Sequence, residues 1–82
     1  MWETYHEWDT TIYRFFLNKE EIAYIEEVYE WVTKKKNYFG FVLGKDREHY
    51  PLKDVSLDNI KIKVIVKAKE LGWPIKEWPI KE

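Results

Sequence analysis

Residues 18–37 constrain the fold more than any other part of the sequence, because a helix start signal, a helical periodicity and a stop signal coincide there. Asn18 suits a helix N-cap, and Glu21, three residues later, completes a capping box. Apolar side chains then recur at spacings of three and four residues, which gathers them on one face of a helix: Ile22, Ile25, Val28, Tyr29 and Val32. The segment therefore predicts an amphipathic helix that ends at Asn37 and packs this face on a core.

Two aromatic side chains of this segment, Tyr24 and Trp31, lie at the edge of the predicted apolar face and make it wider than one packed layer needs. Glu26, Glu27 and Glu30 fall on its opposite, solvated side. We therefore expect Tyr24 and Trp31 to contribute to a contact surface, and the acidic side of the helix to orient a partner.

The residues before this segment have the composition of strands. Residues 2–9 alternate loosely between two sides, and residues 10–17 are dense in β-branched and aromatic side chains. They predict a β-hairpin with its turn at Asp9-Thr10, and a helix that begins before Asn18 is the competing interpretation.

The residues after it predict two further strands. Residues 38–43 are apolar nearly throughout and precede a turn, so they indicate a buried strand. Gly40 in its middle indicates a bulge or the close approach of another backbone. Residues 47–52 suit a short edge strand, because Pro51 cannot donate a hydrogen bond to an interior ladder.

Residues 56–72 support two interpretations. Ile60, Ile62, Val64, Val66 and Ala68 alternate with lysines as in a strand, whereas Leu57, Ile60, Val64, Ala68 and Leu71 form a helical stripe. The two ends favour the helix, because Ser56 suits an N-cap, Gly72 stands where a helix-terminating glycine belongs, and Pro74 follows.

The chain end is an immediate duplication, since Trp73-Pro74-Ile75-Lys76-Glu77 is followed by Trp78-Pro79-Ile80-Lys81-Glu82. One interpretation is a duplication tolerated at a weakly constrained chain end. Another is an extended, proline-stiffened segment that presents its tryptophans to a groove or a sheet edge. A third is that Trp73 packs on the domain while the second copy stays apart.

These predictions combine into one small α+β fold. We expect a single domain over residues 1–72 and an extended tail over residues 73–82. The N-terminal hairpin and a further strand would form a sheet of antiparallel type, packed by two helices.

Catalytic signals are weak. The chain has no cysteine and one serine, which suits a helix cap, so a nucleophilic site has little to be built from. His6 and His49 each have carboxylates nearby but no metal-binding spacing, and the glycine motifs of phosphate loops are absent. We therefore expect neither catalysis nor a cofactor. The lack of cysteine suits the cytoplasm, and no segment has the pattern of a membrane span or signal peptide.

Charge is unevenly distributed along the chain. Residues 1–31 hold eight acidic and two basic residues, and residues 32–82 hold seven acidic and twelve basic residues. Either the two parts complement each other within the fold, or they make a bipolar surface that docks a charged partner or a second copy of the chain.

The sequence favours a non-catalytic protein-binding module, such as an adaptor, regulator or inhibitor of a larger cytoplasmic protein, with self-association as a further expectation. Exposed aromatic side chains flanked by charge would make the contact: Tyr24, Trp31, Glu27, Trp73 and Trp78. The alternative is nucleic-acid binding through lysines and a neighbouring aromatic ring: Lys34, Lys35, Lys36, Tyr38, Lys61, Lys63, Lys67 and Lys69. The acidic N-terminal part weighs against this alternative.

Overall fold

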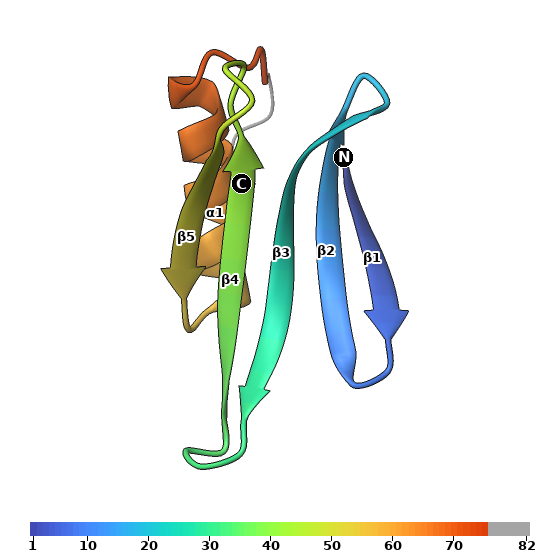
Figure 1. The fold of residues 1–82 in the computed structure, drawn as a ribbon, viewed down its shortest axis with the longest axis vertical. Coiled ribbons are helices and arrows are strands. Elements are labelled where there is room, and N and C mark those ends of the chain that lie inside the picture. Colours follow the sequence, from blue (N-terminus) through green and yellow to red (C-terminus); the bar gives the residue numbers. More distant parts are fainter. Residues whose placement is uncertain (76–82) are drawn as a thin grey trace.

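A computed structural model describes residues 1–75, which form five β-strands and one α-helix (Figure 1). The elements are β1 (Trp2–Glu7), β2 (Thr10–Leu17), β3 (Glu20–Glu30), β4 (Lys35–Leu43), β5 (His49–Asp54) and α1 (Leu57–Glu70). Each strand pairs antiparallel with the next one along the chain, so the sheet order is β1-β2-β3-β4-β5. α1 packs on one face of this sheet, against β3, β4 and β5, and leaves the other face uncovered by any element in residues 1–75.

The predicted helix over residues 18–37 is wrong, and with it the predicted packing of the sheet by two helices. This segment forms β3, a turn at residues 31–34 and the start of β4. Asn18 does not cap a helix. Asn18 (φ 51°) and Lys19 (φ 69°) instead form the two-residue turn between β2 and β3. Two positive φ values are the mark of a type I′ turn, in which asparagine is also favoured.

A β-bulge explains why β3 resembles a helix in the sequence. Phe15 pairs with Ala23 and Phe16 pairs with Glu21, so Ile22 is an extra residue in β3. Both Ile22 and Ala23 are buried, and Ile25 is buried two residues after Ala23. Because the extra residue interrupts the alternation of the strand, Ile22 and Ile25 enter the core at a spacing of three, as they would in a helix.

The strand predictions outside this segment agree with the structure. The N-terminal hairpin is β1 and β2, with its turn at Trp8-Asp9, one residue earlier than predicted. The strand predicted over residues 38–43 is the second part of β4, and β5 is an edge strand that contains Pro51.

The helix interpretation of residues 56–72 is confirmed by α1. The Ser56 hydroxyl accepts a hydrogen bond from the Asn59 backbone N–H at 3.3 Å, as an N-cap does. At the other end, Gly72 has a φ of 99°, which is the left-handed conformation expected of a terminating glycine.

The core lies between α1 and the sheet. Its fully buried side chains come from β2, β3, β4 and α1: Phe15, Ile22, Ile25, Val42, Ile60 and Val64. Gly40 lies under the helix, where a Cβ atom would stand 3.3 Å from Ile60 Cδ1 and 3.4 Å from Val64 Cγ2. The absence of a side chain at Gly40 therefore lets α1 pack closely on β4.

Candidate protein-binding surface

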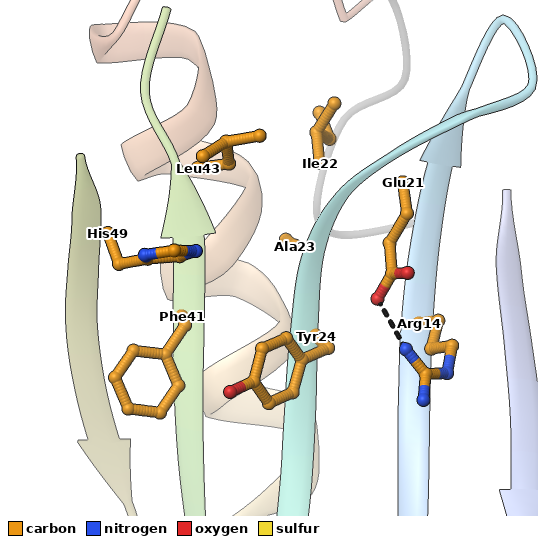
Figure 2. Close-up of a pocket in the computed structure, with 8 residues that line it drawn as sticks. All are labelled: Arg14, Glu21, Ile22, Ala23, Tyr24, Phe41, Leu43 and His49. Carbon is orange, nitrogen blue, oxygen red and sulfur yellow. Dashed lines mark hydrogen bonds and ion pairs between the residues drawn. The ribbon is translucent and has the colours of Figure 1, made fainter. Parts of the chain in front are cut away.

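The side chains that the sequence singled out for protein binding lie in separate places. Tyr24 is on the sheet face opposite α1, where its ring stacks on Phe41 with centroids 5.4 Å apart (Figure 2). Trp31 is in the β3–β4 turn. The Glu27 carboxylate forms an ion pair with the Lys36 ammonium at 2.9 Å. Trp73 packs against the core. Trp78 lies outside the described residues.

The predicted acidic helix face does not exist, because these residues are in β3. Successive side chains of a strand point to opposite faces of the sheet. Glu26 therefore lies on the open face with Tyr24, while Glu27 lies on the face that carries α1. The idea that Glu26, Glu27 and Glu30 orient a partner as one surface is wrong.

A different group of exposed apolar side chains gathers at one end of the sheet. In the β-meander, the β1–β2 turn, the β3–β4 turn and the β5–α1 connection all lie at the lower end of the molecule in Figure 1. Trp8 is 102% exposed, Val32 96%, Trp31 76% and Val55 70%. With Tyr29, whose ring contacts Trp31, these residues lie on three connections that stand apart in Figure 1, and we call the set the hairpin-end patch: Trp8, Tyr29, Trp31, Val32 and Val55.

The β3–β4 hairpin is the part of this patch that projects farthest (Figure 1). The Lys34 backbone N–H donates to the Glu30 carbonyl at 2.7 Å and closes the turn. Within it, the Tyr29 and Trp31 rings meet edge to face, with centroids 4.7 Å apart. This contact fixes the orientation of Trp31 while most of its ring stays in water.

Trp8 has an unusual backbone conformation. It is the first residue of a two-residue turn, its φ is 56°, and the φ of the following Asp9 is not positive. This sign pattern belongs to a type II′ turn, which favours glycine at its first position. A fully exposed tryptophan in a position that suits glycine stabilises nothing inside the fold. Trp8 was not among the residues predicted to bind a partner, although it lies beside the turn of the predicted hairpin.

The lysines of the nucleic-acid alternative do not form one surface. Lys61 lies on the side of α1 that faces β1 and β2, with its Nζ 5.3 Å from the Trp2 ring centroid and 5.2 Å from that of Tyr13. Lys63 and Lys67 lie on the other side, where Lys63 pairs with Asp54 at 2.8 Å. The Lys67 Nζ lies 3.7 Å from the Glu70 Oε1 and 5.3 Å from the centroid of the Tyr50 ring.

The remaining residues of that alternative are distributed between the turn and β4. Lys34 and Lys35 are exposed at the β3–β4 turn, whereas Lys36 is paired with Glu27. Tyr38 packs against the edge of the core. Lys69 lies near the end of α1 and also has an interaction partner.

A shallow depression of about 300 Å³ lies on the open face of the sheet (Figure 2). Arg14 and Glu21 form an ion pair of 2.8 Å at one side of it. The stacked rings of Tyr24 and Phe41 line another side of it, and His49 lies at the β5 side. Arg14 and Glu21 offset each other's charge, so the depression carries little net charge.

The two histidines lie on opposite edges of the sheet, so they do not share a site. His6 is on β1 within 3.3 Å of the Thr11 hydroxyl, and His49 is on β5. Within residues 1–75, no three His, Asp or Glu side chains come together to hold a metal ion. Nor does the helix in this part of the chain have the length and apolarity to cross a membrane.

Two of the groups with displaced pKa values, Asp54 and Tyr13, lie in the contacts between the elements of the fold. The hydrogen bond from Lys63, and then that from the Ser56 backbone N–H, lower the pKa of Asp54. Burial, followed by the nearby Glu27 carboxylate, raises the pKa of Tyr13. Both groups belong to contacts that hold α1 or β2 in place, and neither lies in the hairpin-end patch.

Comparisons of this chain with models of protein families, with curated proteins and with solved structures give no match.

Proposed function

We propose that this domain is a non-catalytic protein-binding module, and that it binds through the hairpin-end patch. The exposure of Trp8 in a backbone position that suits glycine is the observation that carries this proposal. A tryptophan there strains the turn and buries no apolar area within the domain. Such a side chain is explained by a contact outside the domain, and tryptophan is among the side chains most enriched at interface hot spots.

The side chains around Trp8 and Trp31 describe the partner. Glu7 and Asp9 flank Trp8, and exposed Lys34 and Lys35 follow the Trp31 turn. Acidic groups therefore flank Trp8, whereas the Trp31 turn has Glu30 before it and the two lysines at its end. A complementary protein would offer an apolar surface bordered by basic groups opposite Trp8 and by carboxylates opposite Trp31. Binding of this kind suits an adaptor, regulator or inhibitor of a larger protein.

The test compares proteins captured by crosslinking in a cell lysate, with and without nuclease treatment. The patch variant is Trp8→Gly with Trp31→Ala. The matched control is Val66→Ala, since Val66 is 42% exposed on α1, away from the patch. Alanine is also a better helix former than valine, so the control keeps its helix.

We expect the wild type and the Val66→Ala control to capture the same protein, and the patch variant to lose it by about tenfold or more, as hot-spot truncation does. Circular dichroism must show that all three chains are folded. Equal capture by the wild type and the folded patch variant would refute the proposal. Capture that disappears only on nuclease treatment would favour the nucleic-acid alternative.

A further inference from the structure

The first copy of the duplicated sequence is bound to the domain through several distinct contacts. The Trp73 indole Nε1–H donates to the Leu43 carbonyl at 2.7 Å. The Lys45 ammonium lies 5.5 Å from the centroid of the same ring. Two residues later, Ile75 is 8% exposed and belongs to the core. The site therefore recognises an indole N–H, the face of an aromatic ring and an aliphatic side chain two residues further on.

The conformation of this segment is largely set by its own sequence. The Ile75 backbone N–H donates to the Trp73 carbonyl at 2.9 Å, across Pro74. A hydrogen bond between residues i+2 and i closes a γ-turn, and the φ that its inverse form requires at the central residue is the one that proline imposes. Any Trp-Pro-Ile sequence has the same local preference.

We propose that this site is a receptor for Trp-Pro-Ile sequences, and that the second copy, Trp78-Pro79-Ile80, is an interchangeable ligand for it. The two copies have the same donor, the same ring, the same proline and the same aliphatic side chain. The second copy therefore offers the site the same groups, joined by the same φ-restricting proline. Only the length of chain between α1 and the ligand differs, by five residues.

The first copy has the advantage in the wild type because its backbone also ends the helix. The Trp73 N–H donates to the Ala68 carbonyl at 3.0 Å, and the Gly72 N–H donates to the Lys69 carbonyl at 3.0 Å. With the second copy in the site, the hydrogen bond from the Trp73 N–H to α1 would be lost, and the chain between α1 and the site would be five residues longer. Lengthening a loop has a weak effect on stability, since each doubling costs roughly 0.6 kcal/mol. The second copy should therefore take the site once the first copy is impaired.

The test is a mutant cycle with Trp73→Ala, Trp78→Ala and the double variant, measured by urea unfolding. We expect Trp78→Ala to match the wild type and Trp73→Ala to raise the unfolded fraction less than about fivefold. The double variant should raise it about thirtyfold or more, because a half-buried ring and its hydrogen bond are then lost without replacement. If Trp73→Ala and the double variant unfold alike, the second copy does not enter the site.

A second measurement separates exchange of the ligand from a general effect on stability. Hydrogen exchange of indole N–H groups by NMR reports the bond to the Leu43 carbonyl. Trp73→Ala should keep one protected indole N–H that disappears in the double variant, and its loss already in Trp73→Ala would overturn the proposal. Neither measurement involves the hairpin-end patch, so the outcome is independent of the proposed protein binding.

Discussion

Replacing Trp8 by glycine should stabilise the domain, although it removes the largest side chain that a residue can have. The Trp8 ring is fully exposed, so its removal returns no apolar area to water and the hydrophobic contribution to the change is close to zero. The positive backbone angle of Trp8 (φ 56°) therefore decides the change in the free energy of unfolding. A non-glycine residue in the left-handed region costs about 1–2 kcal/mol, and part of this gain is offset because glycine is more flexible in the unfolded chain.

The net expectation is a gain of about 1 kcal/mol in the free energy of unfolding, which raises the melting temperature of a domain of this size by about 4–8 °C. Thermal unfolding followed by far-UV circular dichroism measures it. Trp31→Gly is the matched control, because the φ of Trp31 is not positive and its ring contacts Tyr29. It should lose stability slightly. A melting temperature of Trp8→Gly below that of the wild type would show that the Trp8 ring supports the fold, and the reasoning would fail.

Two further substitutions test the packing and the start of α1. Gly40→Val should lower the free energy of unfolding by about 1–3 kcal/mol, because the new side chain meets Ile60 and Val64. Urea unfolding measures this change. Unchanged stability would mean that α1 can move away from β4. Asp54→Asn should be less stable than the wild type at neutral pH. Because its hydrogen bonds hold the pKa of Asp54 below the usual value of about 3.9, this difference should be complete above that pH and vanish as the pH falls through the lowered pKa. Urea unfolding at a series of pH values from 7 downward tests this, and a difference that does not shrink as the pH falls below the usual pKa of an aspartate would contradict the role of the Asp54 charge.

The sequence predicted α1 and β5 correctly because the residues at their ends or edges each favour one structure. The ends of α1 carry a serine that caps and a glycine with positive φ, and these outweighed the strand-like alternation between them. Pro51 placed β5 at the edge of the sheet, because a missing N–H is tolerated there.

The error over residues 18–37 came from signals with two meanings. Asparagine favours both a helix N-cap and a type I′ turn, so Asn18 could not separate the two. The bulge at Ile22 then gave a strand the three-residue spacing of a helix. A bulge depends on pairing with β2, which is a tertiary property, and no local pattern in β3 reports it.

The hairpin-end patch could be predicted only in part for a similar reason. Trp31 was predicted to be exposed for contact, but on the face of a helix and not in a turn. Val32 is next to Trp31 in the same turn. Trp8 and Val55 come from the β1–β2 turn and the β5–α1 connection, and they lie toward the same end as Trp31 only because the meander brings alternate connections there. Side chains that share a surface through topology have no spacing in the sequence that could reveal it.

α1 follows all five strands in the sequence, so the strands are synthesised before the helix that covers them. Each strand pairs with its predecessor, so the sheet can assemble by successive local steps as the chain leaves the ribosome. Its buried residues, such as Ile25 and Val42, nevertheless have no cover until α1 has been made. Before that point the nascent sheet exposes one apolar face and both edges, which is the state most prone to aggregate. A sheet that has left the ribosome before α1 has emerged would therefore depend on chaperones.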